Sequence, residues 1–123
     1  MLFPKKVKYR KIFTKRRNPK RDLVASRGIT VSFGSHGLRA MGPGRVTSNQ
    51  IEAARRVLSR EMGKAGKVWV RIFPDQSFTK KPAEVKMGKG KGDIQGYLVQ
   101  VWPGRVLFEV DGADEATTRE ALR

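Results

Sequence analysis

The uneven distribution of charge along the chain is the feature that most limits how it can fold. Residues 1–21 contain ten lysines and arginines, two prolines and no acidic residue. A block of like charge of this kind cannot bury enough apolar surface to fold alone. We therefore expect residues 1–22 to form an extended basic arm and residues 23–123 to form one ordinary domain.

The total charge indicates that the chain binds a polyanion. Lysine and arginine together number 27 and aspartate and glutamate 11, so the net charge is +16. Charge of one sign at this level exceeds what solubility requires, and it repels itself unless a partner supplies counter-charge. Nucleic acid is the expected partner. We find no apolar segment of membrane-spanning length and no secretory signal, so a membrane partner is not expected.

A capping box predicts a helix that begins after Thr47. In this motif the Thr47 hydroxyl accepts a hydrogen bond from the backbone N–H of Gln50, and the Gln50 side chain accepts one from the N–H of Thr47. An apolar stripe follows at helical spacing, formed by Ile51, Ala54, Leu58 and Met62. Gly63 and Gly66 predict the end of the helix.

A second, basic stripe on the same helix is a candidate for phosphate contacts. It consists of Arg56, Arg60 and Lys64, with Arg55 beside it. Glu52 lies four residues before Arg56, where an ion pair between them can support the helix. A solvated helix face is the alternative interpretation of these cations.

Alternating and continuous apolar runs predict the strands of the domain. Residues 28–34 alternate with period two and predict a half-buried strand, followed over 35–45 by an irregular loop or bulged strand. Residues 67–74 predict a strand whose even-numbered residues share one face and whose odd-numbered residues share the other. Residues 96–110 predict a short hairpin around a turn at Pro103 and Gly104.

The fold class follows from these elements. A final helix is expected from about Asp114, because acidic residues are favoured at a helix N-terminus. Trp69 and Trp102 are expected in the core. Strands and two helices without regular βαβ alternation predict an α+β domain. We expect a compact domain with a mixed or antiparallel sheet packed with two helices, and with the basic arm and a glycine–lysine loop outside it.

The glycine–lysine loop occupies residues 86–92, where the sequence is Lys-Met-Gly-Lys-Gly-Lys-Gly. Glycine lets the backbone approach another molecule closely, and the lysines supply charge that suits a polyanion. We expect these residues within a flexible loop at about residues 75–96. The loop either touches nucleic acid or is a solvated hairpin tip.

Catalytic and metal-binding patterns are not found. The chain has no cysteine, which excludes thiol catalysis and Cys-ligated zinc. Residues 88–92 lack the closing Gly-Lys-Ser/Thr of a Walker A loop, and Ser35 beside His36 lacks a nucleophile elbow. His36 is expected to contact RNA or to hydrogen-bond within its loop, and Glu109 and Asp111 are expected to be solvated rather than metal-binding. The sequence predicts no enzyme, no cofactor and no metal.

Six groups of residues together, in this order, closely resemble the bacterial-type large-subunit ribosomal protein family uL16, as opposed to its archaeal and eukaryotic counterpart. They lie at residues 1–11, 34–38, 50–56, 69–75, 81–82 and 87–92. The resemblance covers essentially the whole chain. It implies a compact α+β protein of the large ribosomal subunit that takes part in translation, in a cytoplasmic or an organellar ribosome.

The resemblance also implies partners and site residues. Members bind large-subunit rRNA and lie near the peptidyl transferase centre, beside tRNA in the aminoacyl site or in the peptidyl site. The rRNA-binding residues carried over are Lys5, Lys6, Lys8, Arg10, Lys11, Lys15, Arg16, Arg17, Arg45, Arg55, Arg56 and Arg60. The tRNA-binding residues carried over are Lys86, Met87, Gly88, Lys89, Gly90, Lys91 and Gly92. Neighbouring ribosomal proteins are further partners, and no homo-oligomer is expected.

Two departures from the family and two alternatives accompany this assignment. Lys86 stands where members usually carry arginine, so a planar bidentate contact there becomes a point charge. The chain ends at Arg123 without the longer C-terminal helix and tail of many members, and contacts made by that tail are not carried over. Tyr9 and Phe13 either anchor the arm to the domain or stack on bases. A DNA-binding architectural protein is the alternative function, although no recognition helix is visible.

Overall fold

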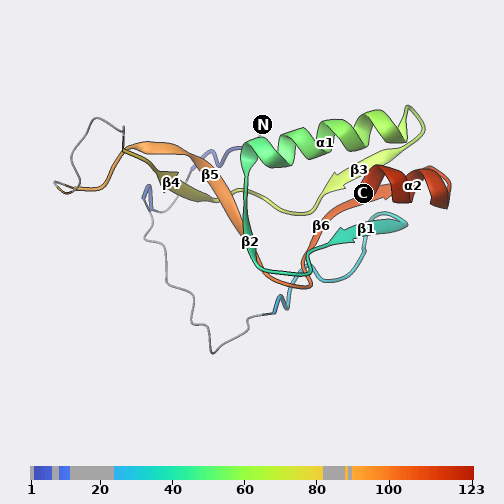
Figure 1. The fold of residues 1–123 in the computed structure, drawn as a ribbon, viewed down its shortest axis with the longest axis horizontal. Helices are drawn as coiled ribbons and strands as arrows, with labels where there is room; N and C mark the ends of the chain where they lie inside the picture. Colours follow the sequence, from blue (N-terminus) through green and yellow to red (C-terminus); the bar gives the residue numbers. More distant parts are fainter. Residues whose placement is uncertain (1, 7–8, 12–23, 82–87, 89) are drawn as a thin grey trace.

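The computed structural model of the chain describes residues 2–6, 9–11, 24–81, 88 and 90–123, and it is an α+β domain (Figure 1). The elements in chain order are β1 (His36–Arg39), β2 (Gly44–Thr47), α1 (Ser48–Met62), β3 (Lys67–Val70), β4 (Gln76–Thr79), β5 (Ile94–Val101), β6 (Val106–Asp111) and α2 (Glu115–Leu122). The predicted fold class is confirmed. The strands form two antiparallel three-stranded sheets, in the orders β1-β6-β3 and β2-β5-β4, where the sequence led us to expect one.

Helix α1 begins and packs as its sequence predicts. Both hydrogen bonds of the capping box are present: the Gln50 N–H donates to the Thr47 hydroxyl at 3.3 Å, and the Thr47 N–H donates to the Gln50 side chain at 2.9 Å. Ile51, Leu58 and Met62 are buried in the core, with Ala54 packed against them. The helix ends at Gly63, its C-cap.

Helix α2 begins at the expected place. The Asp114 side chain caps it by accepting a hydrogen bond from the Thr117 N–H at 3.0 Å. Both helices cover the same face of the β1-β6-β3 sheet (Figure 1), and Ala121 of α2 joins the same core cluster as Ile51 of α1. This cluster also takes Phe108 and Val110 from β6.

The opposite face of this sheet is covered by residues 24–35, which are not the strand that we expected over residues 28–34. The central strand β6 pairs with β1 on one side and β3 on the other, so it has no free edge for a further strand. Ile29, Val31 and Phe33, the apolar members of the alternating pattern, are 46%, 45% and 60% exposed. Backbone hydrogen bonds join the segment to the sheet at Ala25, Gly28 and Ser35, whereas residues 32–34 are held by a side chain.

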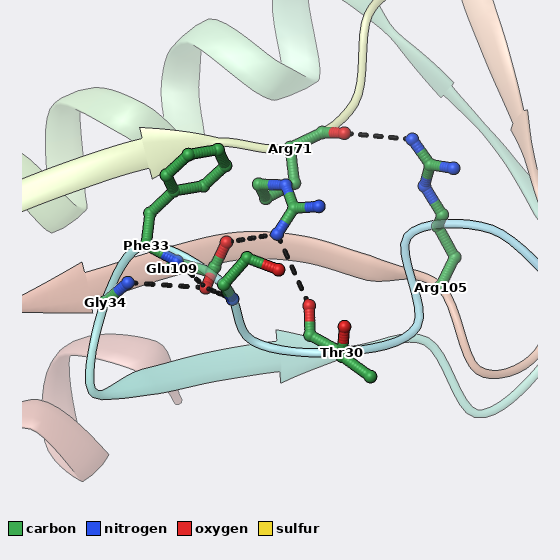
Figure 2. Close-up of polar contacts among 7 residues, drawn as sticks. Thr30, Phe33, Gly34, Arg71, Arg105 and Glu109 are labelled. Carbon is green, nitrogen blue, oxygen red and sulfur yellow. Dashed lines mark hydrogen bonds and ion pairs between the residues drawn. The ribbon is translucent and has the colours of Figure 1, made fainter.

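That side chain is Glu109, which is fully buried, although the sequence led us to expect it in solvent. One carboxylate oxygen accepts hydrogen bonds from the N–H groups of Ser32 at 2.6 Å, Phe33 at 3.0 Å and Gly34 at 3.4 Å (Figure 2). The other oxygen is paired with the guanidinium of Arg71. Glu109 alternates with Phe108 and Val110 along β6, and this alternation turns its side chain away from the helices.

Arg71 extends the same network. Its guanidinium also donates to the Thr30 carbonyl at 3.3 Å and lies 5.0 Å from the centre of the Phe33 ring (Figure 2). The Phe33 ring in turn stacks on Trp69, with ring centres 6.4 Å apart. The strand predicted over residues 67–74 ends at Val70. The prediction nevertheless assigned the two faces correctly, with Val68 and Val70 packed on the core and Trp69 and Arg71 on the other side.

The expected hairpin at residues 96–110 does not form, although its turn does. The Arg105 N–H donates to the Trp102 carbonyl at 3.2 Å, and Gly104 has a φ of 99°, as the third residue of a type II turn requires. Strands β5 and β6 belong to different sheets, because each is already paired on both edges. The turn therefore carries the chain from one sheet to the other, and both tryptophans are half-buried and not in the core.

The chain crosses between the sheets a second time beside this turn. The Ala40 N–H donates to the Arg105 carbonyl and the Gly104 N–H donates to the Ala40 carbonyl, both at 2.8 Å. Strand β1 and the start of β2 fall within residues 35–45, where we expected a loop or bulged strand, and β1 does carry an irregular register between Leu38 and Arg39. Strand β4 also occupies part of the expected loop at residues 75–96.

The buried pair predicts how stability depends on pH. Burial by itself raises the pKa of Glu109, but the Arg71 hydrogen bond and the three backbone N–H groups outweigh it and lower the pKa below its ordinary value of 4.5. A group whose pKa is lowered by folding stabilises the protein above the unfolded-state pKa, and this contribution is lost as the pH falls through the folded-state pKa.

Glu109→Gln is expected to lower the free energy of unfolding by about 3 kcal/mol at pH 7, because it leaves the Arg71 charge without its partner. Urea unfolding of both proteins measures this difference, which should stay constant above pH 5 or so and shrink below pH 4.5. Glu115→Gln is the control, since its pair with Arg119 is exposed and should contribute little. A Glu109 variant as stable as the control variant would contradict the prediction.

Candidate nucleic-acid interface

The described part of the N-terminal arm lies against the β2-β5-β4 sheet. The Phe3 ring meets the Tyr97 ring edge-on, with ring centres 6.0 Å apart, and Leu2 packs against the core cluster. Further along, the hydroxyl of the buried Ser77 on β4 donates to the Arg10 carbonyl at 2.7 Å. These contacts fix the path of the arm while the side chains of Lys5, Lys6, Arg10 and Lys11 stay exposed.

The arm meets the glycine–lysine loop at the end of this sheet. The Lys11 ammonium lies 3.5 Å from the Lys91 carbonyl, to which it donates. Beside this contact is a groove of about 410 Å³ whose lining includes Arg45 of β2, Ser77 of β4 and Lys91. Three parts of the sequence that were separately predicted to bind RNA, the arm, Arg45 and the loop, therefore come together here.

The glycines of the loop adopt backbone conformations that other residues avoid. Gly88 and Gly90 have φ values of 100° and 98°, a region in which a side chain is strained. The Lys81 ammonium donates to the Gly88 carbonyl, and the Lys80 N–H donates to the Asp93 carbonyl at 3.3 Å, so the two sides of the loop are joined at its base. In the described part of the loop, the backbone therefore needs glycine at residues 88 and 90, and residue 90 directly precedes the exposed Lys91.

The basic face of α1 is partly neutralised by Glu52. Arg55 donates to its carboxylate at 2.6 and 3.1 Å, and Arg56 at 3.3 Å. The hydrogen bond from Arg55, together with the charges of Arg55 and Arg56, lowers the pKa of Glu52 to about 2 against the effect of burial. The pairing of Glu52 with Arg56 was expected and is confirmed, whereas its stronger bond to Arg55 was not. Arg60 is exposed on the same helix.

The predicted site residues thus fall into two groups on the molecule. Lys5, Lys6, Arg10, Lys11, Arg45 and the described loop residues Gly88, Gly90, Lys91 and Gly92 belong to the region around the β2-β5-β4 sheet. Arg55, Arg56 and Arg60 lie on α1. Seven predicted residues lie outside the described part of the chain: Lys8, Lys15, Arg16, Arg17, Lys86, Met87 and Lys89. Phe13 also lies outside it, and Tyr9 is 65% exposed.

Several residues that shape this surface were missed in the sequence. Ser77, Lys81 and Tyr97 act through contacts with residues distant in sequence, and no local pattern announces such contacts. The sequence did contain one signal of the role of Glu109, because this residue is a single carboxylate within an apolar strand. His36 does form a hydrogen bond, its Nδ1 lying 3.0 Å from the Ser35 hydroxyl oxygen, but it lies in β1 and not in a loop.

The described residues contain neither a metal-binding cluster nor a membrane-spanning helix. No group of three or more histidine, aspartate or glutamate side chains in them could hold a metal ion. None of the helices they form has the length and apolar character needed to cross a membrane.

Comparison with known proteins gives consistent matches along the chain. A family model described as ribosomal protein L16p/L10e matches residues 4–123. A protein of Afipia carboxidovorans named large ribosomal subunit protein uL16 is 53% identical over 122 residues, which cover 99% of this chain and 86% of that protein. Proteins of the same name from Rhodopseudomonas palustris and Xanthomonas oryzae are 54% and 51% identical, over 99% and 100% of this chain and 86% and 87% of their own lengths.

The low pKa of Glu52 predicts which arginine holds its carboxylate. Arg55→Ala should raise the Glu52 pKa from about 2 well toward 4.5, because it removes the main hydrogen bond. Arg56→Ala, the matched control, should raise it less, because the charge of Arg56 lowers the Glu52 pKa less than the charge of Arg55 does. The ¹³C shift of the Glu52 carboxyl carbon, followed by NMR from acid to neutral pH, measures both. Equal shifts in the two variants would contradict the assignment.

Proposed function

Because this chain belongs to the ribosomal protein L16p/L10e family, it is a structural constituent of the large ribosomal subunit in translation, and we propose how its surface is used there. The arm, Arg45 and the basic face of α1 bind large-subunit rRNA. The glycine–lysine loop faces tRNA in the aminoacyl site. The protein acts by binding and positioning RNA, and it is not an enzyme.

The observation that carries the proposal is the convergence of the rRNA-binding arm and the tRNA-facing loop on one groove. Arg45 and Lys91 line the groove, and Lys11 reaches the Lys91 carbonyl. Backbone phosphates are the ligands that suit several exposed cations around one groove. Each of these residues is exposed, so RNA can reach their side chains from solvent.

The α1 face supplies a second group of phosphate contacts. Arg60 and Arg56 are exposed, and the guanidinium of Arg56 shares one carboxylate with Arg55. One negative charge against these three arginines leaves a net positive surface. One group lies on α1 and the other around the β2-β5-β4 sheet, so together they would hold the domain against RNA through two elements of the fold.

The tRNA-facing role rests on the loop. Its lysines are separated by glycines that allow close backbone approach to a ligand. Its base is tied by Lys81 and Lys80, while Gly88 and Gly90 are exposed. Lys86 would give this loop a point charge where arginine is usual, so it would attract phosphate without a bidentate contact.

A DNA-binding architectural protein would have only the high positive charge in common with this chain. Such proteins read DNA with a helix placed in a groove or with a dimer that matches two half-sites. On the basic face of α1, Arg55 and Arg56 pair with Glu52 of the same helix. This arrangement suits phosphate contact and helix support. Membership of a ribosomal protein family favours RNA.

The rRNA proposal predicts a change in salt dependence. Binding of the free protein to large-subunit rRNA should weaken as KCl rises, and Arg56→Ala/Arg60→Ala should reduce the log–log slope by about 1.4 to 1.8, at about 0.7 to 0.9 for each lost phosphate contact. Filter binding across a KCl series measures the slope. Arg119→Ala on α2, an exposed arginine with its own i,i+4 glutamate, is the matched control. A slope unchanged in the double variant would sink this part of the proposal.

The loop proposal predicts a defect in tRNA binding with folding intact. Lys89→Ala/Lys91→Ala removes two cations from a loop outside the core, so urea unfolding should be unchanged. Large subunits reconstituted with this variant should bind aminoacyl-site tRNA several-fold more weakly. Lys67→Ala, at the exposed start of β3, is the control for loss of one surface charge. Wild-type tRNA affinity in the loop variant would overturn the assignment.

A further inference from the structure

A pocket that none of the assigned RNA contacts uses lies where residues 24–27 pass the junction of the two sheets. Its volume is about 450 Å³, within the range of sites for small organic groups. Its lining includes two aromatic rings, two cations and two further polar side chains: Phe73, Trp102, Arg27, Arg105, Asp75 and Gln100.

The walls of this pocket are fixed by hydrogen bonds. The Ala25 N–H donates to the Pro103 carbonyl at 2.9 Å, and the Val106 N–H donates to the Gly28 carbonyl at 2.8 Å. Between them, the Arg105 guanidinium donates to the Arg27 carbonyl at 3.1 Å and to the Arg71 carbonyl at 3.0 Å. The second of these bonds is drawn in Figure 2. The pocket is therefore preformed, and a ligand would not have to order it.

The side chains around the pocket are those that recognise a nucleotide. Phe73 is 44% exposed and Trp102 is half-buried, so both have ring surface that is open to a ligand. Aromatic rings of this kind stack on unpaired bases. Asp75 and Gln100 are exposed and offer hydrogen-bonding groups for a base edge.

Cations stand where the phosphates on either side of such a base would lie. Arg27 is exposed at the pocket. Arg105 donates to the backbone carbonyl of Arg27, so this bond does not engage the Arg27 side chain. Arg45 lies directly opposite Gln100 in the β2–β5 pairing, and directly opposite residues project from the same face of a sheet. The pocket therefore adjoins a residue of the proposed rRNA surface.

We propose that this pocket receives one unpaired nucleobase of an RNA strand, stacked on Phe73 and Trp102, with its flanking phosphates on Arg27 and Arg45. The inference rests on the RNA binding proposed above and adds base recognition to it. Asp75 has only acceptor oxygens when ionised, so it favours bases that present an amino group, such as cytosine, over uracil. The positive rim argues for RNA rather than for the apolar side chain of a protein partner.

The test uses the full chain with single-stranded hexamers of cytidine, of uridine, and of cytidine with one abasic position. Binding is read in two ways: overall affinity by fluorescence anisotropy, and pocket occupancy by the NMR signal of the Trp102 indole N–H. The Trp69 indole signal is the internal reference. Trp69 stacks on Phe33 and is not among the residues that line the pocket.

The cytidine hexamer should shift the Trp102 signal and bind several-fold more tightly than the uridine hexamer. Phe73→Ala should weaken its binding about ten-fold through lost stacking. Val57→Ala, which alters an apolar side chain of the same 44% exposure on α1, should leave it unchanged. Asp75→Asn should abolish the preference for cytidine, because the amide no longer offers two acceptors.

Salt-sensitive binding of all three hexamers without movement of the Trp102 signal would overturn the pocket while leaving the proposed function intact. Failure of every hexamer to bind would instead remove the RNA binding on which both depend. A Trp102 signal that moves with RNA-free ribosomal proteins and not with RNA would show that the pocket takes a protein side chain, and would also overturn the inference.

Discussion

The buried carboxylate of Glu109 is the interaction on which the arrangement of this protein depends. A carboxylate placed in a core without partners is too costly to persist, and here it is satisfied by Arg71 and by three consecutive backbone N–H groups. Those N–H groups belong to residues 32–34, which have no strand partner. The carboxylate therefore holds residues 24–35 over the sheet face that the helices leave uncovered, and it sets the course of the chain that follows the arm.

The network around Glu109 supports two parts of the proposed RNA-binding surface. The segment that Glu109 and Arg105 hold supplies one wall of the pocket that contains Arg27. Helix α1 packs on the other face of the sheet that contains Glu109, and this packing positions the arginines of α1. The glycine–lysine loop is independent of this network, because it extends from β4 and β5 in the second sheet (Figure 1).

The elements that could be predicted from the sequence are those determined by local chemistry. The capping box and apolar stripe of α1, the Asp114 cap of α2 and the two faces of residues 67–74 all follow from interactions within one element. Pairing between strands could not be predicted in this way. The turn at Pro103–Gly104 was correct but the hairpin was wrong, because whether β5 and β6 pair depends on which distant strands occupy their edges.

The residues of the candidate site also differ in whether local sequence reveals them. Exposed cations such as Arg45 and Arg60 could be identified because charge is rarely buried. The contact of Ser77 with the Arg10 carbonyl, and of Lys11 with the Lys91 carbonyl, joins residues 67 and 80 positions apart, so no local pattern could reveal them. Glu109 was taken for a solvated carboxylate because its partner Arg71 lies 38 residues away, directly after β3.

Amide hydrogen exchange at Ser32, Phe33 and Gly34 in the free protein tests the role of Glu109 most directly. Ser32 and Phe33 are exposed and lie outside every strand, so their N–H groups would exchange quickly if only solvent held them. If the buried carboxylate holds them, all three amides should exchange about a hundred-fold or more slowly than in an unstructured peptide, because opening requires the sheet face to uncover. Exchange at the rate of an unstructured peptide would contradict the account.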